Sequence, residues 1–381
     1  MKDIAFGRPM IDENEKNAVM EVLKNPILTH GKNVKEFEKT FAHFTQTDFA
    51  LAVTSCTAAL HLAYFYAGIG KNDEVIVPSQ THVATAHAAE LLGANAVFVD
   101  SEMKTGNLDI NQIEEKITNE TKVLTVVHYL GMPVDMKKIK KIAEKYNLFV
   151  VEDCALSLGA YIDDIHTGNF GDVGCFSFYP VKHITTGEGG MVVTNNDEIS
   201  SKISNDRAFG IDRQIQERKI PGIYDVQSLG LNYRMNEIQA AMGIEQMKKV
   251  EGFLRDRKNN FERLYQGLEE IEDIHIFTSS YDEFQSSYYC FELILNDSLG
   301  KKRFEIVKNL NNLGIGTSVY YPGPVPLMTY YRTKYGFSQN MFPNASKISN
   351  QGIALPVGPH IGFDEIDYII SKVKKVIKEA K

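Results

Sequence analysis

Short apolar runs alternate regularly with helical segments from about residue 50 onward, and this alternation limits the fold more than any other feature. The apolar runs are long enough for strands and are nearly free of polar positions, which is typical of strands buried on both faces. Such alternation predicts an α/β fold with a mostly parallel sheet covered by helices. The expected strands cover residues 49–54, 74–78, 96–100, 123–128 and 148–152, and the expected helices among them cover residues 55–67, 81–92 and 136–146.

The remaining chain predicts further helices and a second, smaller α/β unit. Asp12 and Glu15 have the spacing of a capping box at the start of a helix. A length of 381 residues favours two domains, and we expect a large domain over residues 1–250 and a small C-terminal domain over residues 251–381. Other expected elements are helices over residues 12–24, 33–44, 236–268, 304–313 and 363–381, strands over residues 288–295 and 317–321, and a long loop over residues 206–231.

Composition excludes several classes of protein. A net charge of -8 argues against binding to nucleic acid. The four cysteines form no CxxC pair and lack histidines at zinc spacing, so no metal site is expected. The N-terminus is too polar for a signal peptide, and no apolar run is long enough to cross a bilayer. These features predict a cytoplasmic protein without a membrane partner.

Lys182 lies between an apolar run that ends at Phe178 and the glycine turn 186–190. A lysine between a strand end and a glycine turn is fixed at its backbone and free at its tip. This arrangement suits an amine that bonds covalently to a carbonyl cofactor. A solvated surface lysine beside a turn is the alternative.

Other polar groups follow the ends of expected strands, where ligands bind in parallel sheets. Asp153 ends a buried strand and needs a cation, such as the protonated ring nitrogen of pyridoxal phosphate (PLP); a helix cap or a salt bridge is the alternative. The small residues 55–58 open a helix and could bind an anion or simply cap it. Ser177 adds a hydroxyl, and His82 could stack on a cofactor or pack on a helix face.

The order of several motifs resembles fold-type-I PLP enzymes and, more closely, the DegT/StrS family of sugar-nucleotide aminotransferases. The resemblance covers nearly the whole chain, from FGRPMIDENEKNAVMEVLKN near the N-terminus to ALPVGPH at 354–360. The motifs between these ends are TSCTAAL (54–60), PSQTHVATAHA (78–88), VEDCALSLGA (151–160), FSFYPVKHITTGEGG (176–190), LGLNYRMNEIQAAMG (229–243) and GIGTSVYYPGPVPLM (314–328).

The resemblance implies a role for each matched position. Lys182 falls on the family's Schiff-base lysine and Asp153 on the partner of the pyridine nitrogen, so these two would be catalytic. His82 would stack on the ring. The residues implied to hold the cofactor phosphate are Thr57, Ala58 and Ser177, with Asn232 reaching it from the second subunit of a homodimer. Glu188 and Tyr320 would face the sugar.

Three positions depart from the family pattern. Leu156 stands where Gln or His usually contacts the cofactor hydroxyl, His82 replaces a Phe, Trp or Tyr, and Tyr320 replaces a histidine. Relatives in which histidine replaces the lysine are dehydratases, but here Lys182 is present and His183 only follows it.

The resemblance therefore implies transfer of an amino group from an amino acid, L-glutamate by analogy, to the C4 keto group of a nucleotide-linked deoxysugar. C3 amination, a PLP-dependent sugar dehydratase and a non-catalytic sensor or scaffold remain open. A plain nucleotide-binding protein is disfavoured, because no GxGxxG or Walker pattern follows an expected strand.

Overall fold

A computed structural model describes residues 3–211, 220 and 223–381. Its centre is a seven-stranded sheet in the order β1-β9-β8-β5-β4-β2-β3. Only β9 runs against the other strands, because its pairings with β1 and β8 are antiparallel and the remaining pairings are parallel. The strands are β1 (Phe49–Val53), β2 (Glu74–Pro78), β3 (Asn95–Val99), β4 (Thr121–Val127), β5 (Phe149–Asp153), β8 (Val173–Ser177) and β9 (Gly190–Thr194).

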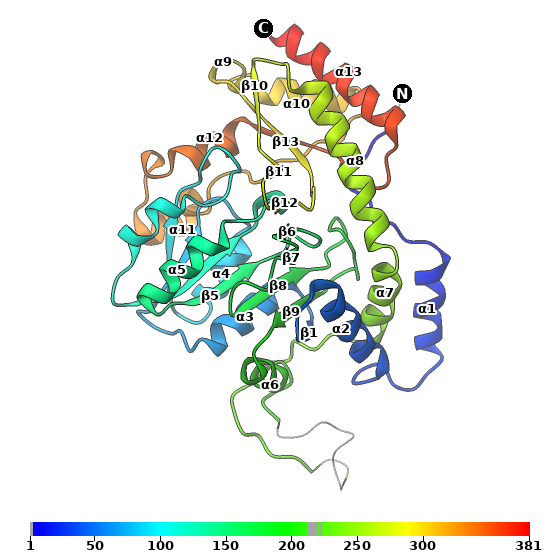
Figure 1. The fold of residues 1–381 in the computed structure, drawn as a ribbon, viewed down its shortest axis with the longest axis vertical. Coiled ribbons are helices and arrows are strands. Elements are labelled where there is room, and N and C mark those ends of the chain that lie inside the picture. The colour runs from blue at the N-terminus through cyan, green and yellow to red at the C-terminus, as the bar shows by residue number, and fades with distance from the viewer. Residues whose placement is uncertain (1–2, 212–219, 221–222) are drawn as a thin grey trace.

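Helices cover both faces of this sheet (Figure 1). Alternate residues of β1 show why: Leu51 and Val53 belong to one apolar core, and Ala50 and Ala52 to another. The first core packs against α3 (Cys56–Tyr66), α4 (Val83–Glu90), α6 (Asp197–Asp206), α11 (Thr329–Tyr335) and α12 (Pro343–Gln351). The opposite face packs against α2 (Lys32–Thr45), α7 (Glu237–Met247) and α5 (Met136–Tyr146), while α1 (Glu13–Leu23) packs on α7. The predicted α/β fold with a mostly parallel sheet is confirmed.

The C-terminal part has a small antiparallel sheet and a core of its own. Its strands follow the order β10 (Ile274–Ile276), β13 (Phe291–Leu295), β14 (Gly352–Leu355). They pack with α8 (Val250–Leu268), α9 (Asp297–Gly300), α10 (Arg303–Asn312) and α13 (Phe363–Ala380). A third sheet joins β11 (Ser280–Tyr281), β12 (Phe284–Gln285), β6 (Tyr161–Ile162) and β7 (Ile165–His166). Figure 1 shows α8 running along the side of the molecule from α7 towards α13.

Most expected elements are found, with a few differences. The capping box of Asp12 and Glu15 is present. The expected helix 236–268 is two helices, α7 and α8, which meet beside residue 250; the domain boundary there stays a prediction. The expected strand 317–321 is wrong, because only Ser318 forms a bridge, to Ala354 in β14. Of the expected loop 206–231, residues 212–219 and 221–222 lie outside the described residues.

Short helices of the 3-10 type connect several of these elements: η1 (Ile110–Gln112), η2 (Glu114–Lys116), η3 (Tyr129–Gly131), η5 (Val325–Leu327) and η6 (Gln339–Met341). In the described part of the chain, no helix is long and apolar enough to span a bilayer.

Candidate active site

One edge of the large sheet collects the ends of strands that are distant in sequence. Gly190 at the start of β9 pairs with Val53 at the end of β1 and with Ser177 at the end of β8. A Cβ built on Gly190 would lie 2.4 Å from the carbonyl carbon of Ser55, so only glycine allows the start of α3 to approach β9 this closely. The helix start, the end of β8 and the turn before β9 therefore share one edge.

The first turn of α3 presents small residues at this edge. Ser55 is the N-cap, and its Oγ accepts a hydrogen bond of 3.1 Å from the N–H of Ala58. Thr57 is half-buried in the same turn, as is Ser177 at the end of β8. The capping alternative is thus correct for Ser55. It is compatible with anion binding, because the positive end of the α3 dipole lies at the same place.

Asp153 is buried at the end of β5, and its carboxylate is held from two sides. Oδ2 accepts a hydrogen bond of 2.8 Å from the hydroxyl of Thr85 in α4, and Oδ1 accepts one of 3.1 Å from the N–H of Ala155. The Cys56 thiol of α3 lies 4.0 Å from Oδ1. These contacts fix the position of the carboxylate, which can bind a cationic group.

Lys182 lies in the connection between β8 and β9 and is half-buried. Burial of its amine lowers the pKa of Lys182 to about 8, against the opposing effect of Cys56, Asp153 and Cys290. The amine also lies 5.2 Å from the centre of the Tyr289 ring. A lowered pKa gives the amine a substantial neutral, nucleophilic fraction near neutral pH.

His82 belongs to the same group. Desolvation is the largest cause of the lowered pKa of His82, the charge of Lys182 lowers the pKa further, and Asp153 opposes the shift. Its Nδ1 accepts a hydrogen bond of 3.2 Å from the N–H of Ala84, so His82 caps α4, a contact that sequence reasoning missed. Its ring meets that of Tyr321 edge-on, with 5.9 Å between centres. The structure thus brings Lys182, Asp153 and His82 into one electrostatic neighbourhood.

The two residues implied to face the sugar occupy different surroundings. Tyr320 is half-buried, and its hydroxyl lies 2.8 Å from that of Tyr289, the ring beside Lys182. Glu188 is exposed in the turn before β9, and its carbonyl accepts a 2.6 Å hydrogen bond from Gln239 in α7. Among the residues that the structure describes, none forms a hydrogen bond or ion pair with its carboxylate.

Asn232 lies in a segment that meets the end of β1, where the N–H of Thr54 donates a 2.9 Å hydrogen bond to the carbonyl of Tyr233. Asn232 is exposed and forms a backbone bridge with Ala208, just beyond α6. Within the described residues, no hydrogen bond joins its side chain to Lys182 or Asp153. The contact with a second copy of the chain that the resemblance implies for Asn232 stays a prediction.

Leu156, the position that departs from the family pattern, lies in the core. Its side chain packs in an apolar cluster with Tyr129 and Tyr289, and its carbonyl accepts a 2.7 Å hydrogen bond from Ser287. No polar side chain at position 156 is thus available for a cofactor hydroxyl.

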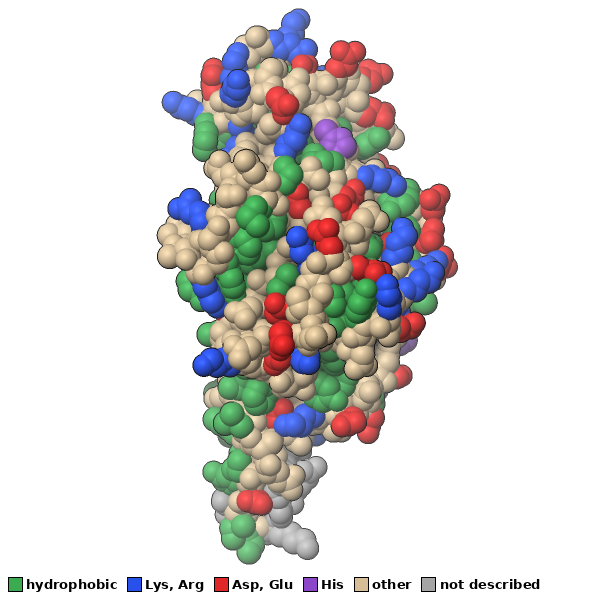
Figure 2. Space-filling model, turned by 90° about the vertical axis from the view of Figure 1, so that its left-hand side faces the viewer, with side chains coloured by type: hydrophobic (Ala, Val, Ile, Leu, Met, Phe, Trp, Pro, Cys, Tyr) green, Lys and Arg blue, Asp and Glu red, His purple; other side chains and the backbone are tan. Residues whose placement is uncertain are grey.

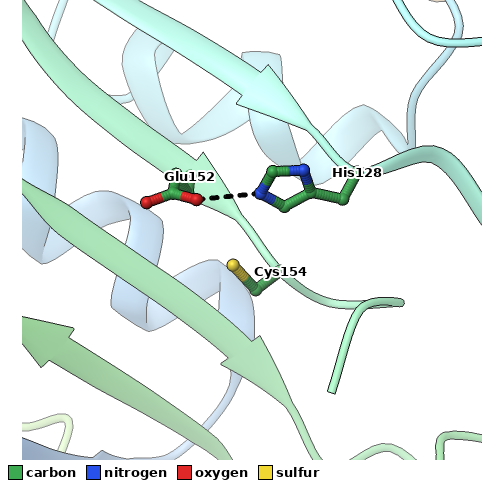
Figure 3. Close-up of side chains that lie close together, drawn as sticks. All are labelled: His128, Glu152 and Cys154. Carbon is green, nitrogen blue, oxygen red and sulfur yellow. Dashed lines mark hydrogen bonds and ion pairs between the residues drawn. The ribbon is translucent and has the colours of Figure 1, made fainter. Parts of the chain in front are cut away.

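Glu152 precedes Asp153 on β5, and its buried carboxylate is hydrogen-bonded to His128 (Figure 3). We call Glu152 and the groups that donate hydrogen bonds to it the latch. Glu152 Oε2 lies 2.9 Å from His128 Nε2, and the thiol of Cys154 is close to both. His128 Nδ1 accepts a hydrogen bond of 3.1 Å from the N–H of Val134, so the ring proton is on Nε2, which donates a hydrogen bond to Glu152. His128, Glu152 and Cys154 are residue types that can bind a metal ion. The His128 nitrogens and the Glu152 oxygens, however, already form hydrogen bonds within the protein.

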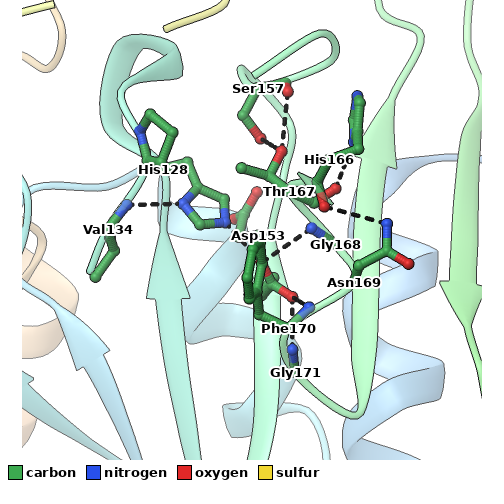
Figure 4. A network of polar contacts seen from close by, with 12 residues as sticks. His128, Val134, Asp153, Ser157, His166, Thr167, Gly168, Asn169, Phe170 and Gly171 are labelled. Atoms are coloured by element: carbon green, nitrogen blue, oxygen red, sulfur yellow. Dashed lines mark hydrogen bonds and ion pairs between the residues drawn. The ribbon is translucent and has the colours of Figure 1, made fainter. Parts of the chain in front are cut away.

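Three backbone amides complete the latch (Figure 4). Gly168 donates to Oε2 at 2.9 Å, while Phe170 and Gly171 donate to Oε1 at 2.8 and 2.6 Å. The latch ties the end of β4 and the turn before β8 to β5. It thereby holds the strand end that carries Asp153.

Solved structures with the same fold contain a cofactor. The protein Spr1654 from Streptococcus pneumoniae in its PLP form has 28% sequence identity and a TM-score of 0.93, with 100% of each chain covered. The same protein in its PMP form has a TM-score of 0.94 with 27% identity, again over 100% of both chains.

PLP is the cofactor of this chain, and the chemistry of the site fits it. Lys182 offers an amine of lowered pKa to an aldehyde. Asp153 offers a fixed, buried carboxylate to the ring nitrogen. The start of α3, with Thr57 and Ala58, offers the positive end of a helix to a phosphate.

Curated relatives match nearly the whole chain. GDP-perosamine synthase of Escherichia coli O157:H7 is 34% identical over 378 residues, which cover 98% of this chain and 99% of the relative. UDP-4-amino-4,6-dideoxy-N-acetyl-beta-L-altrosamine transaminase of Campylobacter jejuni is 31% identical over 99% of this chain and 98% of its own. Residues 9–374 match the DegT/DnrJ/EryC1/StrS aminotransferase family. The chain, a PLP-dependent aminotransferase, therefore belongs to the DegT/DnrJ/EryC1/StrS family.

Proposed function

We propose that this aminotransferase moves an amino group from L-glutamate to the C4 keto group of a nucleotide-linked keto-deoxysugar. The observation that carries the proposal is the Lys182 amine, with its lowered pKa, in the electrostatic neighbourhood of the fixed Asp153 carboxylate. The names of the two curated relatives support a nucleotide-sugar substrate, and the Campylobacter name specifies an amino group at C4.

When bound, PLP supplies an aldehyde that takes up the amino group and a ring that withdraws electrons from the reacting carbon. Asp153 would keep the ring nitrogen protonated, and Lys182 would hold the aldehyde. The Lys182 amine would take the proton from Cα of the donor as general base and return it as general acid. For the keto sugar, the same amine would deliver a proton to C4 of the sugar. Thr57, Ala58 and Ser177 would hold the phosphate, and His82 would face the ring.

The position of His183 favours transamination over dehydration. His183 is buried, and its Nε2 lies 3.0 Å from the carbonyl oxygen of Ser287. Desolvation and then the charge of Arg257 lower its pKa, which keeps the ring neutral. It is therefore engaged in the core, and Lys182 is the base offered to the reacting carbon.

We also propose a homodimer in which Asn232 completes the site of the second copy, with the protein acting in the cytoplasm. The described residues near Asn232 include exposed apolar side chains, among them Phe209, Val226 and Leu229. Figure 2 shows hydrophobic side chains gathered at the lower end of the molecule, on the projecting segment after α6. Light scattering coupled to size exclusion would test this, since a mass of one chain contradicts the dimer.

The test of the activity is a screen of 4-keto and 3-keto deoxysugars, linked to UDP, GDP or dTDP, with PLP and L-glutamate. Mass spectrometry should detect an amino sugar and 2-oxoglutarate, with the C4 isomer formed fastest. The Lys182→Ala variant is the control and should form neither product. Release of keto sugar and ammonia would favour the dehydratase instead, and failure of every sugar would require another carbonyl acceptor.

A further inference from the structure

A buried carboxyl group lies in the small sheet, away from the residues assigned so far. Glu292 in the middle of β13 is buried, and its Oε1 has no hydrogen-bond partner in the described part of the chain. A Cβ on Gly352 of β14 would lie 2.6 Å from this oxygen, so the glycine leaves the space that the carboxyl fills. No ion pair to Glu292 is found among the described residues. A carboxylate left without a cation in such a place is costly, whereas a neutral acid is not.

The second carboxyl oxygen belongs to a network that converges on the main-chain carbonyl of Tyr320. Glu292 Oε2 lies 2.8 Å from the hydroxyl of Tyr129, which also hydrogen-bonds the Tyr320 carbonyl. The same carbonyl accepts a 2.6 Å hydrogen bond from Gln80 Nε2, and Gln80 Oε1 accepts one of 2.9 Å from Ser349. Residues that follow β2 and β4 of the large sheet therefore meet the small sheet at one carbonyl.

Counting protons assigns the state of this network. The Tyr129 hydroxyl has a single proton, but it lies within hydrogen-bond distance of two acceptors, Glu292 Oε2 and the Tyr320 carbonyl. The carbonyl can only accept. Both contacts are satisfied together only if Glu292 is protonated. Its O–H then donates a hydrogen bond to the Tyr129 oxygen, and the Tyr129 hydroxyl donates one to the Tyr320 carbonyl. An ionised Glu292 would accept the hydrogen bond of the Tyr129 hydroxyl, and the Tyr320 carbonyl would lose that bond.

The Tyr320 segment adjoins the active site through two ring contacts. The Tyr320 hydroxyl lies 2.8 Å from that of Tyr289, whose ring is 5.2 Å from the Lys182 amine. The next residue, Tyr321, has its ring 5.9 Å from that of His82. A shift of the Tyr320 carbonyl would therefore move side chains beside Lys182 and His82.

We propose that protonated Glu292 is a positioning residue for the substrate pocket: through Tyr129 it holds the Tyr320 carbonyl and thereby the Tyr320 and Tyr321 side chains. The assignment of Tyr320 to the sugar pocket rests on the proposed function, whereas the network itself does not. Ionisation of Glu292 releases the carbonyl and weakens binding of the sugar nucleotide.

The groups around Glu292 agree with this state. Burial raises the pKa of Glu292 to about 8; the Tyr129 hydroxyl, the Tyr320 backbone and Arg303 of α10 oppose the shift. Cys290, directly before β13, is a neighbouring titratable group, and burial raises the pKa of its thiol, so it stays neutral. Burial likewise raises the pKa of Tyr129, which remains a hydroxyl throughout this range.

The first test compares the pH dependence of wild-type protein with that of Glu292→Gln. Glutamine can donate an amide proton to Tyr129 but cannot ionise. If only the protonated form has a competent pocket, the wild-type KM for the keto-sugar nucleotide rises about tenfold between pH 7 and pH 9, in proportion to the lost competent fraction. Glu292→Gln should show no such rise. Titration of Lys182 occurs in both proteins, and the control Glu305→Gln, an exposed position on α10, should behave as wild type.

A second readout does not depend on the sugar. Hydrogen exchange of a peptide spanning residues 317–323 should accelerate above pH 8 beyond the intrinsic rate in wild type, and Glu292→Gln should lack this excess. Tyr129→Phe should show the fast exchange already at pH 7. Equal pH profiles for wild type and Glu292→Gln in both experiments would overturn the inference. Failure of all keto sugars together with the expected exchange pattern would reject the proposed function alone.

Discussion

The latch around Glu152 makes a strong prediction about stability, for the substitution Glu152→Gln. The carboxylate accepts four hydrogen bonds in a fully buried place, two at each oxygen. An amide has the same shape but offers an oxygen on one side only. If its nitrogen replaces Oε1, the N–H groups of Phe170 and Gly171 lose their acceptor. If it replaces Oε2, Gly168 and His128 lose theirs.

His128 cannot repair this loss by moving its proton to the other ring nitrogen. Its Nδ1 already accepts from the N–H of Val134, so the exchange would only transfer the missing bond to Val134. Two buried donors are thus left without a partner in either orientation. At about 1–3 kcal/mol for each such group, Glu152→Gln should lower the free energy of unfolding by roughly 2–6 kcal/mol, a large share of typical domain stability.

Urea unfolding of the cofactor-free protein measures this difference. The chain has 18 Tyr and no Trp, so tyrosine fluorescence and far-UV circular dichroism are suitable probes, and their transitions should be compared for coincidence. Glu144→Gln, at an exposed position of α5, is the matched control and should change stability by less than about 0.5 kcal/mol. If Glu152→Gln behaves like this control, the latch does not stabilise the fold as argued.

The sign of the pH dependence gives a further check on the same variant. Burial alone would raise the pKa of Glu152, but the hydrogen bond from His128 and the amides of Gly171 and Gly168 bring it below the ordinary value of 4.5. A carboxyl with a lowered pKa in the folded state contributes its stability above the unfolded value and loses it as the pH falls through the folded value. The difference between wild type and Glu152→Gln should therefore be constant above about pH 5 and shrink in acid.

Three other predictions concern the cofactor and the dimer. The pKa of Lys182 is lowered from 10.5 to about 8, so the rate at which PLP recombines with cofactor-free enzyme should rise with pH and be half-maximal near 8. A midpoint above about 10, the ordinary range of a lysine amine, would contradict the lowered pKa. Thr85→Val removes the hydroxyl that donates to Asp153 and should weaken PLP binding about tenfold in equilibrium dialysis, whereas Thr118→Val, at a hydroxyl bonded to Glu74 far from the site, should not. Lys182→Ala and Asn232→Ala proteins, each inactive alone, should regain about a quarter of wild-type activity after subunit exchange, because half of the dimers then have one intact site; no recovery in verified heterodimers would refute shared sites.

The sequence allowed the sheet and part of the site to be predicted because those features are local or follow from strand direction. Lys182, Asp153 and His82 come together because the ends of parallel strands and the loops after them share one edge. Tyr289 was missed because it lies within an apolar run, where nothing local distinguishes a core tyrosine from one beside a lysine amine.

The error at residues 317–321 has a related cause. Alternating residues predict a strand, but whether a partner strand is available depends on distant residues. Here β13 pairs with β14, about 60 residues further along the chain, and Ser318 forms only one bridge to that strand. The rest of the segment is held by side chains, since Gln80 and Tyr129 hydrogen-bond the Tyr320 carbonyl. Such side-chain partners leave no periodic signal in the sequence.

The acidic pair at the end of β5 shows what strand geometry adds to a motif. Neighbouring residues of a strand point to opposite faces, so Glu152 and Asp153 cannot both meet the cofactor. The structure directs Asp153 towards Thr85 and Cys56 on the side of α3 and α4, and Glu152 towards His128 and the turn before β8. A buried carboxylate on the second face needs its own donors, and it has four. The group available for chemistry is thus held at a strand end that its neighbour fixes, and β5 cannot shift at Asp153 without breaking bonds at Glu152.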